Sequence, residues 1–198
     1  MNRKIKMRIV RFARPLVWPL RLGVHFAGGW DLVAEDIDHW VRRITNPTLR
    51  ALQPEDQFVW LTIRHSEFRT LVHYRNRGLP LLVRVALSQL YRPRVSLDIE
   101  CENIGAGLFI QHGFATTITA ERIGRGCWIN QQVTIGHNSK GCPTIGDHVR
   151  IAAGAVVVGA ITVHDGATIG ANATVVDDVA AGDVLVSPKA ISIRNRMN

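Results

Sequence analysis

The hexads IGDHVR, IAAGAV, VVGAIT, VHDGAT, IGANAT and VVDDVA follow one another without a break from residue 145 to residue 180. Each hexad opens on an aliphatic residue, and a second, mostly small apolar residue stands four positions later. A period of six fits neither an α-helix, which repeats at about 3.6, nor a single strand, which repeats at about 2. It is typical of a short strand and a turn that form one side of a three-sided solenoid. The stretch therefore predicts a parallel β-helix.

The same spacing of isoleucines recurs nearer the N-terminus, at Ile104 and Ile110 and again from Ile123 to Ile135. The next isoleucine, Ile145, follows after ten residues, which is one hexad plus four. We expect the extra residues, 137–141, to leave the prism as a loop, because a solenoid expels insertions from its core. Such loops commonly line a binding face.

The first half of the chain has helical patterns instead. One runs from Trp30 to Ile44, a second begins at Pro54, and a last apolar one covers roughly Leu81 to Leu90. The predicted organisation is a basic arm and an α-helical segment over residues 1–94, a β-helix over residues 95–186, and a tail over residues 187–198.

The net charge of +8 is concentrated at the N-terminus, where residues 1–25 contain seven lysines and arginines and no acid. Apolar residues alternate with these cations, a mixture that suits an anionic membrane surface or a polyanion. A frayed arm or an oligomer contact explains it equally well. The run is too short and too charged to cross a membrane, and it lacks the uninterrupted apolar region of a secretory signal.

Composition also bears on compartment and partners. The three cysteines, Cys101, Cys127 and Cys142, show no CxxC spacing, which favours a reducing, cytoplasmic compartment, with membrane association through the basic N-terminus left open. The sequence has no basic and aromatic recognition motif, so we expect no nucleic-acid partner.

One segment departs from the plain repeat, Gln111-His112-Gly113, which follows Ile104-Gly105 by about one hexad. An imidazole is the side chain best suited to take a proton from a hydroxyl near neutral pH. His112 is therefore a candidate general base, although an isolated histidine of this kind is more often an ordinary surface residue.

A set of short motifs gives His112 a context. The chain resembles the serine acetyltransferase family of left-handed β-helix acyltransferases over about residues 64–191, and it looks closest to the branch from capsule, exopolysaccharide and O-antigen gene clusters. The motifs that carry the resemblance are Asp98-Ile99, Ile104-Gly105-Ala106-Gly107, His112-Gly113, INQQVTIG at 129–136, PTIGD at 143–147 and IAAGA at 151–155, together with the helical approach Glu67-Phe68-Arg69 and Tyr74-Arg75.

The resemblance implies an acetyl-CoA-dependent O-acetyltransferase in which His112 is the general base and Asp98 orients it. The spacing after Asp98 is one residue shorter than the family pattern, so Glu100 or Glu102 are alternatives to Asp98. The acceptor hydroxyl would attack the thioester directly, with no covalent enzyme intermediate. The family places acetyl-CoA in the groove between neighbouring subunits of a homotrimer; the matching positions here are Ala152, Ala153, Gly154, Gly159 and Lys189.

The expected acceptor follows from the loop over residues 137–141 and from the residues just before Pro143. His137 and Asn138 are candidate acceptor contacts. Serine acetyltransferases carry an Arg-His pair before the Pro-x-Ile-Gly motif that holds the carboxylate and amine of serine, whereas this chain has Gly141-Cys142. A glycine and a thiol cannot replace a guanidinium. We therefore expect a sugar hydroxyl in a polysaccharide or its precursor as the acceptor.

Three alternatives remain at this point. The first is a serine O-acetyltransferase of cysteine biosynthesis. The second, of another class, is a non-catalytic trimeric β-helix scaffold. The third is a zinc enzyme like the trimeric β-helix carbonic anhydrases, but His112, His137, His148 and His164 are spaced 25, 11 and 16 residues apart, which does not match their ligand pattern. We therefore expect no metal.

Overall fold

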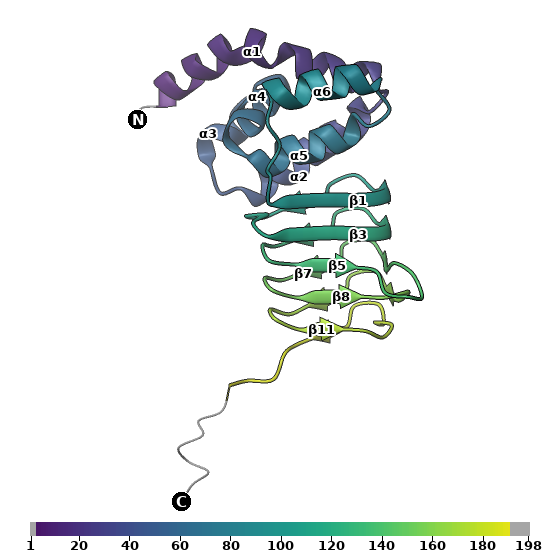
Figure 1. Ribbon diagram of the computed structural model, residues 1–198. Coiled ribbons are helices and arrows are strands. Elements are labelled where there is room, and N and C mark those ends of the chain that lie inside the picture. Colours follow the sequence, from purple (N-terminus) through teal and green to yellow (C-terminus); the bar gives the residue numbers. More distant parts are fainter. Residues whose placement is uncertain (1–2, 191–198) are drawn as a thin grey trace, which may run out of the picture.

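The computed structural model describes residues 3–190, except for the side chains of residues 3–7 and 9. The tail over 191–198 and the side chains of Arg3, Lys4 and Lys6 thus lie outside the described residues. A group of helices sits at one end of a stacked β-structure (Figure 1). The helices are α1 (Arg3–Phe26), α2 (Trp30–Arg43), α3 (Pro47–Arg50), α4 (Pro54–Arg64), α5 (Ser66–Arg75) and α6 (Leu81–Leu90).

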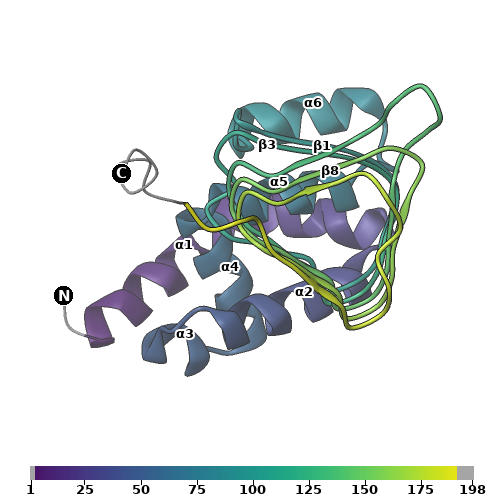
Figure 2. The same cartoon turned by 90° about the horizontal axis from the view of Figure 1, so that it is seen from below.

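The second half of the chain is a three-sided parallel β-helix, which Figure 2 shows along its axis as a triangle. Every strand pair is parallel, as the stacking of successive coils requires. The strands are β1 (Leu97–Ile104), β2 (Phe109–Ile110), β3 (Thr116–Ile123), β4 (Trp128–Ile129), β5 (Thr134–Gly136), β6 (Thr144–Ile145), β7 (Arg150–Ile151), β8 (Val156–Val158), β9 (Thr162–Val163), β10 (Thr168–Ile169), β11 (Thr174–Val175) and β12 (Val184–Leu185).

The hexad positions stack in register as three buried ladders, one for each side of the prism. One side pairs Ile118, Ile135, Val157 and Val175, the second pairs Ile104, Ile123, Ile145 and Val163, and the third pairs Ile110, Ile129, Ile151 and Ile169. Burial of each such side chain contributes about 1.5–3 kcal/mol. The predicted fold class, a parallel β-helix preceded by helices, is confirmed. The loop after Gly136 projects from one corner (Figure 2).

The basic N-terminal segment, for which the sequence analysis named no helix, is helical. It forms α1, whose buried residues Val10, Ala13, Val17, Leu20 and Val24 recur every three or four positions. That spacing gives a helix one apolar face. Both internal prolines, Pro15 and Pro19, are exposed on the outer side. No helix of the described part of the chain is long and apolar enough to span a bilayer.

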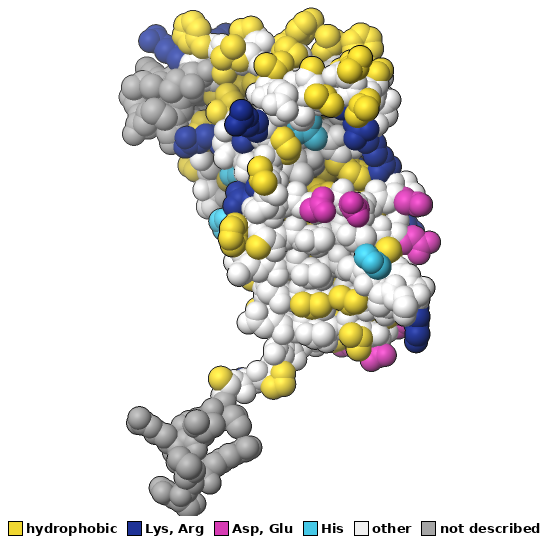
Figure 3. Space-filling model, in the orientation of Figure 1, with side chains coloured by type: hydrophobic (Ala, Val, Ile, Leu, Met, Phe, Trp, Pro, Cys, Tyr) yellow, Lys and Arg dark blue, Asp and Glu magenta, His cyan; other side chains and the backbone are white. Residues whose placement is uncertain are grey.

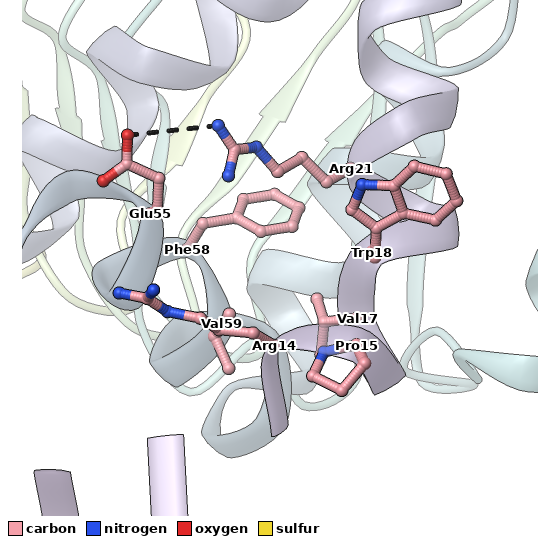
Figure 4. A pocket seen from close by; sticks show the side chains of 8 residues that line it. All are labelled: Arg14, Pro15, Val17, Trp18, Arg21, Glu55, Phe58 and Val59. Carbon is pink, nitrogen blue, oxygen red and sulfur yellow. Dashed lines mark ion pairs between the residues drawn. The ribbon is translucent and has the colours of Figure 1, made fainter. Parts of the chain in front are cut away.

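Helix α1 packs against α4 around a hollow of about 360 Å³ (Figure 4). Val17, Trp18 and Phe58 supply most of its apolar lining, while Arg14 donates to Asp56 at 2.6 Å beside it and Arg21 lies 4.0 Å from Glu55 at its rim. The hollow belongs to the helical segment and does not include residues of the predicted site.

A buried ion pair joins the helices to the first coil of the β-helix. Nε of Arg75 on α5 lies 3.0 Å from Oδ2 of Asp36 on α2, and the side chains of Asp36 and Arg75 are 1% and 3% exposed. Arg75 also donates to the carbonyl oxygens of Ile104 and Gly105, and Asp36 accepts from the N–H of Gly107 at 2.7 Å. Helices and β-helix therefore share one hydrogen-bonded junction.

Candidate active site

His112 stands on the outside of the prism, at the corner between β2 and β3. Its backbone is left-handed, with φ of 60°, and its side chain is exposed. The imidazole therefore points away from the aliphatic core and is open to a solvent-borne acceptor. A residue that only filled the coil interior would not be placed in this way.

The helical segment approaches this corner closely. A Cβ atom added to Gly113 would lie 3.1 Å from Cγ of Glu67 and 3.2 Å from Cδ2 of Leu97. Glycine at position 113 thus lets the N-terminal end of α5 pack against the backbone beside His112. The His-Gly motif has a steric reason in this contact.

Glu67 brings other ionisable groups to the same corner. Its carboxylate lies 3.0 Å from Nη1 of Arg94, and the two side chains are 10% and 30% exposed. His65, two residues earlier, packs edge-on against Trp40, with ring centroids 5.8 Å apart. Burial lowers the pKa of His65; the carboxylate of Glu67 opposes that shift, and the charge of Arg64 adds to it. The site is therefore a mixed group of two imidazoles, a carboxylate and a guanidinium.

Asp98 occupies an exposed position on β1, in register with Thr117 of β3. Within residues 3–190, no hydrogen bond joins it to His112. Glu100 and Glu102 are exposed on the same strand and, with Cys142, line a separate hollow of about 500 Å³. The partner of His112 stays a prediction, and Glu67 joins the candidates.

The predicted acetyl-CoA residues divide between two corners and the chain end. Ala152, Ala153 and Gly154 share the corner of His112, two coils further along the axis, because Ile151 stacks on Ile129 and Ile129 on Ile110. Gly154 has φ of 72°, and an added Cβ would lie 2.2 Å from Oδ1 of Asn172. The turn needs glycine there with or without a ligand.

Gly159 lies instead at the next corner, against the side chain of Asn138, and Lys189 is exposed beyond β12. The loop residues His137 and Asn138 are exposed at that same second corner. Within one chain, then, the structure does not bring the loop to His112. Among residues 3–190 no group of three or more His, Cys, Asp or Glu side chains is arranged to hold a metal.

Comparison with known proteins places this site in a family. Residues 142–177 match the model of the bacterial transferase hexapeptide (six repeats). The serine acetyltransferase of Helicobacter pylori is 39% identical over 129 residues, which cover 62% of this chain and 75% of the relative. This chain belongs to the serine acetyltransferase family.

Other members agree with this assignment. The serine acetyltransferase of Staphylococcus xylosus is 43% identical over half of this chain and 49% of its own length. The crystal structure of serine acetyltransferase 1 from Entamoeba histolytica has a TM-score of 0.61 at 24% identity, covering 93% of this chain and 74% of the other. At that identity the structural match supports the fold alone.

Family membership confirms the predicted acyltransferase and its co-substrate, acetyl-CoA. It corrects two other predictions. The relatives found are serine acetyltransferases, so the placement in the capsule and exopolysaccharide branch is not supported, and the prediction of a sugar acceptor is wrong. That prediction gave too much weight to Gly141-Cys142, because a cation elsewhere in the fold can replace one missing from a loop.

Proposed function

We propose that this chain is a serine O-acetyltransferase, with His112 as the general base. The sequence likeness to the Helicobacter pylori enzyme carries the proposal, since it spans three quarters of that protein. The exposed position of His112 at a corner of the prism supports it. The scaffold alternative offers no role for an imidazole placed in this way.

The reaction follows from the chemistry of the groups. The imidazole of His112 takes the proton from the serine hydroxyl as its oxygen attacks the thioester carbon of acetyl-CoA. The tetrahedral intermediate collapses with cleavage of the carbon–sulfur bond, and the proton leaves with the CoA thiol. A carboxylate beside the imidazole, Asp98 or Glu67, stabilises the imidazolium that forms in between. The buried thiol of Cys127, whose pKa burial raises to about 12, is unsuited to act as a nucleophile.

The assembly we propose is a homotrimer with its active sites between chains. His112 and the loop with His137 and Asn138 occupy different corners of one prism, so a second chain is needed for both to contact one acceptor. Acetyl-CoA would lie along that seam, near Ala152–Gly154. Sedimentation of the purified protein tests the trimer.

The function itself is tested by the release of CoA from acetyl-CoA in the presence of L-serine, with the product identified by mass spectrometry. We expect O-acetylserine, and no comparable release with N-acetylglucosamine or glucose as the acceptor. CoA release that does not depend on L-serine would reject the proposal.

Peripheral membrane contact is a further part of the proposal. Helices α1 and α6 present exposed apolar side chains at the end of the molecule away from the β-helix (Figure 3), and Phe12, Leu16 and Leu82 are 80%, 72% and 84% exposed. Arg8 and Arg11 are exposed nearby, and neither helix contains an acid. Cations beside apolar residues favour an anionic bilayer and disfavour the same face of a second copy.

We expect the protein to sediment with vesicles of phosphatidylglycerol and phosphatidylcholine and not with phosphatidylcholine alone. Because each cation near an anionic bilayer contributes about 1 kcal/mol, the double substitution Arg8→Glu and Arg11→Glu should weaken this binding by about tenfold or more. Equal binding by the variant, or no binding by the unchanged protein, would remove membrane contact from the proposal.

A further inference from the structure

An enzyme that acetylates serine must hold the carboxylate of serine while its hydroxyl reaches the base. In this chain the loop position offers Gly141 and Cys142, and the hollow beside Cys142 is lined by Glu100, Glu102 and Glu121, whose charge repels a carboxylate. Building on the proposed function, we infer that Arg94, held in place by Glu67, binds the carboxylate of the acceptor and thereby sets specificity for an amino acid.

Arg94 is anchored on one side and available on the other. It lies between α6 and β1; its backbone N–H donates to Oγ1 of Thr70, and Nη1 donates to Glu67 and to Oγ of Ser66 at 3.0 and 3.2 Å. Within residues 3–190, Nε and Nη2 have no hydrogen-bond partner, and Nε is buried. Because Nε is closed to a ligand and Nη1 is committed to Glu67 and Ser66, Nη2 is the nitrogen that can donate a charge-assisted hydrogen bond to a carboxylate.

The position relative to the base suits a small acceptor. Glu67, the ion-pair partner of Arg94, contacts the backbone of Gly113, the residue after His112. Leu97, three residues after Arg94, packs against the same glycine. Arg94 is thus linked to the corner of His112 through Glu67 and Leu97, which both approach Gly113. Serine separates its hydroxyl from its carboxylate by only two carbon atoms, so the inference requires Arg94 and His112 to contact opposite ends of one small acceptor.

Glu67 has a second consequence for recognition. It already offsets part of the positive charge of Arg94, and its carboxylate is mostly buried. The ammonium group of an amino acid that enters beside Arg94 meets this carboxylate, so the pair presents one charge of each sign to a zwitterion. A sugar has neither charge and gains nothing from the pair.

The test compares two acceptors that differ only in the carboxylate. L-serine and L-serinamide are assayed as substrates, or L-serinamide as a competitive inhibitor, with the unchanged protein and with Arg94→Met. Losing a charge-assisted hydrogen bond should raise KM for L-serine by about 10- to 100-fold, with kcat within about threefold. Binding of L-serinamide should stay the same. A purely structural ion pair would change both acceptors alike, and that result, or an unchanged KM for L-serine, overturns the inference.

Three further variants separate the loss of a carboxylate contact from a general loss of charge and from a structural defect. Arg92→Met removes an exposed cation two residues away and should leave KM unchanged. Arg94→Lys keeps the charge and should recover part of the affinity for L-serine, while the binding of L-serinamide again stays the same. Since Arg94→Met leaves Glu67 without its partner, the double variant Glu67→Gln and Arg94→Met repeats the comparison without a buried unpaired charge. Failure of the unchanged protein to acetylate L-serine would reject the proposed function first, and the inference with it.

Discussion

Replacing His112 by alanine is expected to lower kcat by about two to four orders of magnitude, because that is what a positioned general base contributes. The side chain is exposed and supports no packing, so the variant should fold and bind acetyl-CoA as before. The rate of CoA release with L-serine, measured beside the thermal unfolding midpoint, separates a catalytic loss from a folding defect.

His164→Ala is the matched control for this variant. His164 is also an exposed histidine of the β-helix, but it follows β9 at another corner. We expect its kcat to stay within about twofold of the unchanged protein, a bound consistent with a surface residue outside the site. If both variants, or neither, lost turnover, His112 would have no special role as a base.

The substitution Arg75→Met should have the largest effect on stability. It leaves the carboxylate of Asp36 buried without its partner and removes the donors to Ile104 and Gly105. Breaking a buried pair in this way costs about 3–5 kcal/mol of the free energy of unfolding. Urea denaturation followed by tryptophan fluorescence measures the change, since Trp40 lies at the same junction and donates to the carbonyl of Leu108.

Two further variants show whether the junction is responsible. Asp38→Ala removes an exposed pair with Arg42 on the same helix, which should cost less than about 1 kcal/mol. Adding Asp36→Asn to Arg75→Met removes the unpaired charge and should recover part of the loss. A loss for Arg75→Met no larger than that for Asp38→Ala would contradict the buried junction.

The fold could be predicted from the hexad repeat because the position of each residue within its hexad determines the side of the prism on which it lies. Ile145, Ile151 and Val157 each stand at the start of a hexad, and stacking places them on three successive sides with no information from distant residues. The same reasoning predicted the loop after Ile135, since the extra residues have no place in the prism. The helix starts at Pro54 and Leu81 could be predicted because a proline stands at or just before each of them.

The features that could not be predicted from the sequence depend on contacts between segments that are distant in the chain. Pro15 and Pro19 concealed α1, although the spacing of Val10, Val17 and Val24 could have revealed its buried face. No sequence pattern joins Asp36 to Arg75 or Glu67 to Arg94, because each pair forms only when the helices dock on the first coil. The role that we propose for Glu67 and Arg94 could not be predicted from the sequence for this reason.

The acceptor shows the limit of motif reasoning most clearly. The absence of an Arg-His pair at Gly141-Cys142 argued against a carboxylate, yet the fold holds another guanidinium, that of Arg94, against Glu67, which approaches Gly113 beside the proposed base. A missing motif argues against a function only when no other part of the chain can reach the same point in space.

The most direct test of the central claim is the identity of the product made from acetyl-CoA when L-serine and N-acetylglucosamine are offered together. Mass spectrometry of the mixture identifies which acceptor is acetylated. Running it in parallel for the unchanged protein and for His112→Ala shows whether the reaction depends on the proposed base. The account predicts O-acetylserine from the unchanged protein and almost none from the variant. An acetylated sugar as the main product, or equal O-acetylserine from both proteins, would contradict it.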